Sequence, residues 1–186
     1  MEGNDNQGHP ELYDKITRYT AQNYAVIYAV EKDPTRAVLH MRRHDVEVED
    51  LIESRTLTII SRDKMYSIER TGLDGHALLN SWHDVMLKVK KASDFKGILA
   101  IGSAENFFDP AIDPCKLVKY EGMVGKRFHI SFEGICCYSE NAVDRLSLGH
   151  LVSILNSHYS TIHKDQLYKQ WQPTRVLELT REILAK

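Results

Sequence analysis

The sequence predicts an α/β protein with a single domain, in which a mostly parallel central sheet carries helices on both faces. Short apolar runs rich in β-branched residues alternate along the chain with segments of helical periodicity. Each link between consecutive strands is long enough for a crossover helix, which parallel strands require. The chain has 186 residues, a length that suits one domain and supports a core without disulfides or metal.

The first helix and the first strand follow a loose N-terminal tail. Residues 1–8 are rich in Gly, Asn, Asp and Gln, which predicts a flexible segment. Residues 10–22 place apolar side chains at the spacing of one helix face. The run AVIYAV at 25–30 is short, continuous and apolar, which is typical of a strand buried on both faces. Asp33 then precedes a proline and is the predicted N-cap of a second helix.

The middle of the chain predicts two strands around one long amphipathic helix. Residues 44–54 are acidic and favour a short helical turn, and residues 56–60 are the next strand. Residues 74–92 place their apolar side chains on one helix face. Residues 95–102 form the most apolar segment of the chain, so we expect this strand to lie centrally in the sheet.

The remainder of the chain predicts three more helices and two more strands. They are a helix over 114–126, a strand within 130–138, a helix from Asn141 to about Ser157, a short edge strand over 159–163, and a last helix over 174–185.

Charge and hydropathy exclude several classes of protein. Lys and Arg number 24 and Asp and Glu number 26, so a net charge of −2 provides no positive field for nucleic acid. No apolar run approaches the roughly 20 residues of a membrane span, and the N-terminus lacks a signal-peptide pattern. We therefore expect a cytoplasmic protein with reduced cysteines, without nucleic acid or membrane as a direct partner.

Motifs for catalysis and metal binding are weak. Gly3 and Gly8 have the spacing of a phosphate-binding loop, but His9 and Pro10 stand where a lysine and a hydroxyl would bind phosphate and Mg²⁺. The nine histidines and three cysteines lack the paired spacing of a structural zinc site. Cys136 and Cys137 lie in an apolar run typical of core residues. The sequence therefore predicts no catalytic residue, no metal and no cofactor.

Several short segments follow one another in a definite order. They are His9 with Leu12-Tyr13-Asp14, then Gly97 to Gly102 with Glu105, then Leu117 to Glu121, then Cys137-Tyr138, and last Ser157-His158-Tyr159. In this order they resemble the MEDS family, the methanogen/methylotroph sensory domain, over most of the chain. The resemblance implies a fold similar to RecA and KaiC with a degraded phosphate loop. It also implies a sensor of small molecules, such as hydrocarbon derivatives.

On this basis we expect a non-catalytic regulator in signal transduction. A flexible tail (1–8) would precede a sensory domain (9–165) and a C-terminal helix (166–186) that packs on the domain or on a partner. Ligands of parallel sheets bind outside the carboxyl ends of the strands, so we expect a small, largely apolar ligand there. The predicted ligand-binding residues are His9, Tyr13, Glu105, Tyr120, Glu121, Tyr138 and His158. The ligand would signal to a partner protein, with a homodimer as another arrangement.

Two alternatives stay open. One is a divergent RecA-like nucleotide-binding protein or ATPase, whose phosphate contacts would come from outside the Gly3–Gly8 loop. The other is a dimeric interaction protein without a ligand.

Overall fold

The structure is a computed structural model that describes residues 10–30, 33–65, 74–103, 112–124, 129–163, 166–169 and 173–185. The chain divides into two compact units. The first, here the sheet unit, comprises Met1–Gly72, His76–Ala104 and Phe128–Cys137. The second, here the C-terminal unit, comprises Leu73–Gly75, Glu105–Arg127 and Tyr138–Lys186.

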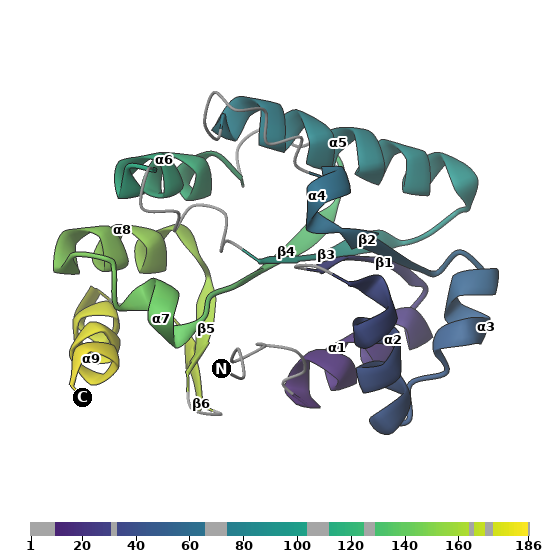
Figure 1. The fold of residues 1–186 in the computed structure, drawn as a ribbon, viewed down its shortest axis with the longest axis horizontal. Helices are drawn as coiled ribbons and strands as arrows, with labels where there is room; N and C mark the ends of the chain where they lie inside the picture. Colours follow the sequence, from purple (N-terminus) through teal and green to yellow (C-terminus); the bar gives the residue numbers. More distant parts are fainter. Residues whose placement is uncertain are drawn as a thin grey trace. The chain divides into compact units, whose positions relative to one another are not determined.

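The sheet unit contains a four-stranded sheet in which every neighbouring pair is parallel (Figure 1). The strand order is β2-β1-β3-β4, and the strands are β1 (Tyr24–Val30), β2 (Leu57–Ser61), β3 (Gly97–Ser103) and β4 (Phe132–Cys137). The α/β class with a parallel central sheet is thereby confirmed. The apolar segment 95–102 becomes β3, which is an interior strand as predicted.

Helices cover both faces of this sheet, also as predicted. Figure 1 shows α5 on one face and α1 and α2 on the other. The helices of the sheet unit are α1 (Pro10–Ala21), α2 (Pro34–Arg43), α3 (Val48–Glu53), α4 (Arg62–Met65) and α5 (Gly75–Ala92). None of the helices within the described ranges has the length and apolar character needed to cross a membrane.

The core of the sheet unit follows from the alternation of side chains along each strand. Val26, Tyr28 and Val30 of β1 belong to a buried cluster with Tyr13 and Ile16 of α1. The residues between them on β1 point to the opposite face, where α5 buries Leu78, Leu79, Trp82 and Met86. Because both faces are covered, β1 is apolar along its whole length, which is why its sequence reads as a continuous run.

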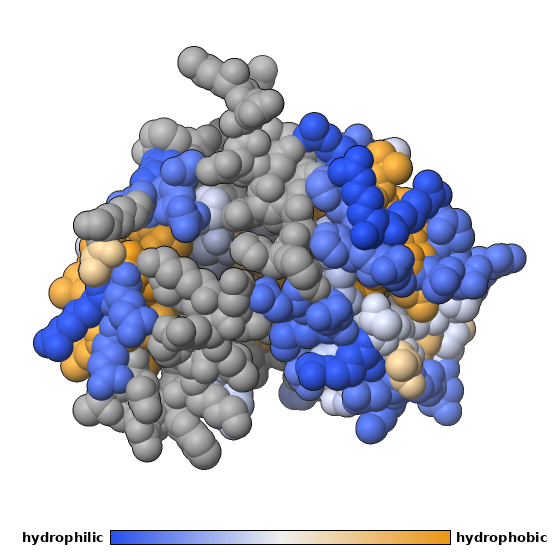
Figure 2. Space-filling model, turned by 90° about the horizontal axis from the view of Figure 1, so that it is seen from below, coloured by the Kyte–Doolittle hydropathy of each residue, from blue (hydrophilic) through white to orange (hydrophobic). Residues whose placement is uncertain are grey.

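The surface seen in Figure 2 is hydrophilic over most of its described area, with smaller apolar areas between. In the sheet unit, Leu39 of α2 and Ile52 of α3 are large apolar side chains that are exposed. Apolar side chains scattered in this way are ordinary on a folded surface and mark no site by themselves.

The C-terminal unit is mainly helical. Its elements are α6 (Pro114–Val124), α7 (Glu140–Val143), α8 (Leu148–Ser157), β5 (Ser160–His163), β6 (Gln166–Lys169) and α9 (Pro173–Leu184). α8 packs against both α6 and α9. Strands β5 and β6 pair with each other in an antiparallel ribbon.

Three predictions in this region are wrong in detail. The single helix from Asn141 to Ser157 is two helices, because serines start both of them. Ser139 accepts a hydrogen bond from the Ala142 amide, and Ser147 accepts one from the His150 amide. The strand expected at 159–163 exists as β5, but it pairs with β6 in a separate ribbon instead of lying at the edge of the parallel sheet. Residues 166–169, expected within the C-terminal helix, form β6, and the helix starts at Pro173.

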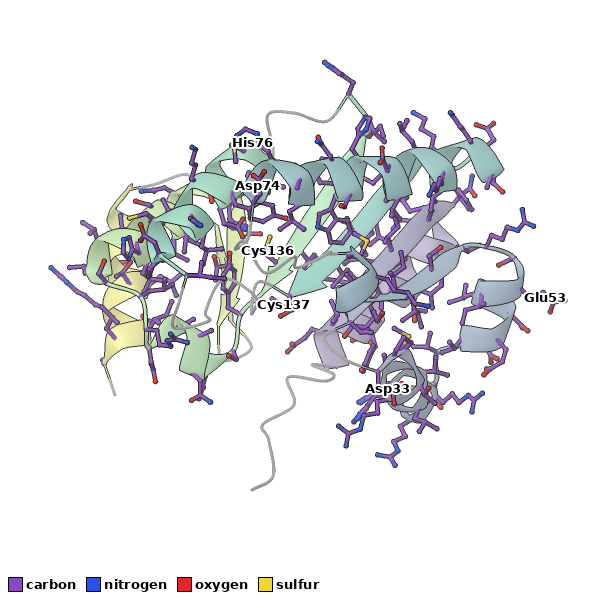
Figure 3. All side chains as sticks on the ribbon, turned by 45° about the horizontal axis from the view of Figure 1, so that its top comes forward. Asp33, Glu53, Asp74, His76, Cys136 and Cys137 are labelled. Atoms are coloured by element: carbon purple, nitrogen blue, oxygen red, sulfur yellow. The ribbon has the colours of Figure 1, made fainter. Side chains whose placement is uncertain are left out.

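Asp33 is the N-cap of α2, as the sequence predicts, and is labelled in Figure 3. Its carboxylate accepts a hydrogen bond from the Thr35 amide at 2.8 Å. We expect Asp33→Ala to lower the free energy of unfolding by about 1 kcal/mol, because one amide of the first turn loses its acceptor. Urea denaturation measures the loss. Asp33→Ser keeps an acceptor and serves as the control, and an equal loss in both variants would contradict the capping role.

Candidate functional site

The predicted ligand-binding residues are divided between the two units. Tyr13 lies in the sheet unit, and Tyr120, Glu121, Tyr138 and His158 lie in the C-terminal unit. His9 and Glu105 are outside the described residues, as is the Gly3–Gly8 loop. Polar side chains come together within each of the two units.

In the sheet unit, the strand order creates a topological switch point between β1 and β3. The chain leaves β1 toward β2 on one side, and it leaves β3 toward β4 on the other. Ligands of open parallel sheets bind in the crevice that such a switch leaves outside the carboxyl ends of the strands. α1 is joined to the start of β1 by only two residues, so its first turns lie toward the carboxyl end of that strand.

Tyr13 of α1 has a buried hydroxyl group with no hydrogen-bond partner among the described residues. The side chain is 1% exposed, and burial raises the pKa of its phenol. The ring lies against the imidazole of His44, with 5.0 Å between the ring centroids. A buried polar atom without a partner is uncommon in folded proteins and costs about 1–3 kcal/mol.

Tyr28 and Cys137 bring two more polar groups to the same cluster. Burial is the main cause of a raised pKa at Tyr28, and the charges of Cys137 and Tyr13 raise it further. Cys137 packs against the buried cluster that contains both tyrosines. At neutral pH both phenols are therefore protonated hydrogen-bond donors near the ends of β1 and β4.

Cys136 and Cys137 are consecutive on β4 and are labelled in Figure 3. Because neighbouring residues of a strand point to opposite faces, only Cys137 faces the cluster around Tyr13. Neither cysteine is in a disulfide.

The C-terminal unit brings Glu121, Tyr138 and His158 together. The Glu121 side chain on α6 is 2% exposed. The Tyr138 hydroxyl donates a hydrogen bond to Oε1 of Glu121 at 2.5 Å. Nε2 of His158 lies 3.4 Å from Oε2 of the same carboxylate. A buried carboxylate needs such partners, because burial without them is costly.

Local structure explains how these three side chains are positioned. Glu121 shares the buried face of α6 with Leu117 and Tyr120, at the spacing of neighbouring turns. Tyr138 directly precedes Ser139, the N-cap that starts α7. His158 is the C-cap of α8. Tyr120 is buried beside Glu121 on the helix, so four of the predicted residues belong to this unit's interior or its edge.

A thiol and an imidazole that the sequence did not single out lie together at the start of α6. Cys115 Sγ is 3.5 Å from His150 Nε2. A hydrogen bond to the Asp113 carboxylate is the main cause of the raised pKa of the Cys115 thiol. A thiol with a raised pKa is a weaker nucleophile at neutral pH, because less of it is thiolate. The pair is 35 residues apart in the sequence, so no local motif indicates it.

We expect Tyr13→Phe to stabilise the chain by about 1 kcal/mol, because it removes a buried hydroxyl without a partner and keeps the ring. The melting temperature would rise by roughly 2–4 °C for a domain of this size. Tyr19→Phe is the matched control, because the Tyr19 hydroxyl donates to Glu133 and its loss should not stabilise the chain. Calorimetry measures the melting temperatures of both variants. A destabilised Tyr13→Phe protein would show that the hydroxyl is hydrogen-bonded.

Comparison with known families adds one match. The family model MEDS, described as the methanogen/methylotroph, DcmR sensory domain, matches residues 5–158, which is more than half of the chain. No curated protein and no solved structure matches the sequence significantly.

Proposed function

The chain belongs to the MEDS family of sensory domains, and on that premise we propose that it binds a small molecule and signals its presence to a partner protein. The proposed ligand site is the cluster of Tyr13, Tyr28 and Cys137 in the sheet unit. One observation carries this assignment: the Tyr13 hydroxyl is buried and has no hydrogen-bond partner among the described residues.

The chemistry of the cluster defines the class of ligand. Tyr13 and Tyr28 offer hydroxyl donors, and their surroundings are the apolar side chains of the core. Such a site favours a small, uncharged and largely apolar molecule that carries one hydrogen-bond acceptor, such as a carbonyl oxygen. A charged ligand is disfavoured, because it would have to give up its hydration in an apolar core.

Burial of the cluster makes binding and conformational change a single event. Tyr13 is only 1% exposed, so a ligand reaches its hydroxyl only when α1 moves relative to β1. A ligand that binds the moved state shifts the population toward it by its difference in affinity for the two states. A signalling partner that distinguishes the two positions of α1 would then receive the signal.

The test is a thermal-shift screen with paired compounds, for example a ketone and the alkane of the same shape. A ligand at 100 times its dissociation constant adds about 2.7 kcal/mol, which corresponds to several degrees for a domain of this size. We expect the acceptor-bearing compound to stabilise the wild-type chain more than the Tyr13→Phe variant. The alkane should affect both chains equally.

Two outcomes would overturn the proposal. An acceptor-bearing compound that stabilises wild type and Tyr13→Phe equally would remove the hydroxyl from the site. Stabilisation by ATP with Mg²⁺, without any effect of the organic compounds, would favour the nucleotide-binding alternative. Light scattering of the same samples measures the oligomeric state with and without ligand.

A further inference from the structure

We propose that Glu121 and His158 in the C-terminal unit hold a divalent transition-metal ion of the Zn²⁺ class. A carboxylate oxygen and an imidazole nitrogen are both ligands that Zn²⁺ takes in proteins. The ligating atoms of these two residues lie within 4.8 Å of each other. The site shares no residue with the proposed ligand site in the sheet unit, so either proposal can fail without the other.

A contact with the backbone of α8 indicates which ring nitrogen of His158 carries the proton. Nδ1 of His158 lies 2.8 Å from the carbonyl oxygen of Ile154. A carbonyl oxygen only accepts, so this contact is a hydrogen bond when Nδ1 carries the proton. In the neutral imidazole, Nε2 is then the nitrogen with a lone pair, and it is directed at the Glu121 carboxylate.

The separation of the two ligating atoms fits a metal between them. Nε2 of His158 and Oε2 of Glu121 are 3.4 Å apart. With Zn–N of about 2.0–2.1 Å and Zn–O of about 2.0–2.2 Å at a tetrahedral angle, the two atoms would lie about 3.3–3.5 Å apart. The observed distance falls within this interval.

Both residues also have the outer contacts that metal ligands use. Metal-binding histidines commonly donate their other ring N–H to a backbone carbonyl, as His158 does to Ile154. Ligating carboxylates are themselves hydrogen-bonded, as Glu121 is by the Tyr138 hydroxyl on its other oxygen. These contacts hold the two ligating atoms in place before an ion arrives.

The histidine–carboxylate pair is partly open to solvent. The His158 side chain is 21% exposed, whereas Glu121 is buried, so solvent reaches one side of the pair. Water can supply further ligands there, which leaves the metal with positions that a small molecule could take. An imidazole ligand favours Zn²⁺, Co²⁺ or Ni²⁺ over Mg²⁺ and Ca²⁺, which prefer oxygen ligands.

Calorimetric titration with Zn²⁺ tests the proposal, together with the visible absorption of the Co²⁺-loaded chain. We expect one ion per chain, and binding at least tenfold weaker in Glu121→Gln and in His158→Gln. Tyr138→Phe removes an outer contact and should weaken binding by about 10–100-fold. The Co²⁺ spectrum should indicate nitrogen and oxygen ligands. Circular dichroism of each variant checks that it is folded.

His83→Gln is the matched control. His83 and Asp84 form a histidine–carboxylate pair on α5, with Nδ1 and Oδ1 3.9 Å apart and both side chains exposed. The His83→Gln substitution should leave the Zn²⁺ affinity unchanged. The proposal is overturned if wild type binds no ion, if His83→Gln weakens binding as much as His158→Gln, or if all folded variants bind as wild type does.

Discussion

Replacing Ile101 by Ala is expected to lower the free energy of unfolding by about 3–5 kcal/mol. Ile101 is fully buried in β3, an interior strand of the parallel sheet. It stands in register with Tyr28 of β1 and Ile135 of β4, so strands flank it on both sides. Truncation removes the transfer free energy of the lost methyl and methylene groups and leaves a cavity. A strand fixed by two ladders cannot move in to fill that cavity.

Guanidinium denaturation of the variant measures this loss. Ile101→Val removes a single methylene from the same position and serves as the matched control, with an expected loss of about 0.5–1.5 kcal/mol. A loss below 1 kcal/mol for Ile101→Ala, with an unchanged denaturant slope, would show that this position is not packed as the structure has it.

Replacing Glu121 by Ala is expected to have the second largest effect, a loss of about 3 kcal/mol. The substitution leaves the Tyr138 hydroxyl and the His158 imidazole without the carboxylate they face. A hydrogen bond to a charged group contributes about 1.5–3 kcal/mol, and the shortened side chain leaves a cavity. Three segments of the C-terminal unit meet at this carboxylate, so all three lose a contact at once.

Denaturation in the presence of a chelator measures this effect without any contribution from bound metal. Glu121→Gln is the control, because its amide oxygen can still accept the hydrogen bond from Tyr138 in nearly the same volume. We expect the glutamine variant to retain most of the stability that alanine loses. Equal losses in the two variants would mean that the charge of Glu121, and not its hydrogen bonding, stabilises the unit.

Most of the fold could be predicted because its signals are local. The run at 25–30 is apolar throughout since both faces of β1 are covered, and its β-branched residues suit a strand. Asp33 followed by proline predicts the start of α2, because the Asp33 side chain accepts the hydrogen bond that caps this helix. The interior position of β3 follows from its apolar composition. In each case the physical cause lies within a few residues of the pattern.

The errors arose where two local signals competed or where pairing was distant. Apolar residues from 141 to 157 have helical spacing, but the serine caps at 139 and 147 divide the segment into two helices. The ribbon of β5 and β6 depends on pairing between two four-residue segments, neither of which has a strong pattern of its own. The likeness to RecA and KaiC stays a prediction.

The candidate sites were predictable only in part. The amphipathic spacing of α6 indicates that Glu121 points inward, and the structure buries it. Its meeting with His158 is a tertiary contact, and no spacing in the sequence encodes it. Whether the Tyr13 hydroxyl has a partner depends on every atom around it, so the sequence gives no signal for it.

One peptide bond joins the two polar groups described above. Cys137 belongs to the buried cluster of the sheet unit, and the next residue, Tyr138, donates to Glu121 in the C-terminal unit. The boundary between the two units therefore falls in the chain between these two residues. Substitutions at adjacent positions thus probe two different proposals: position 137 probes the buried cluster, and position 138 probes the carboxylate of α6.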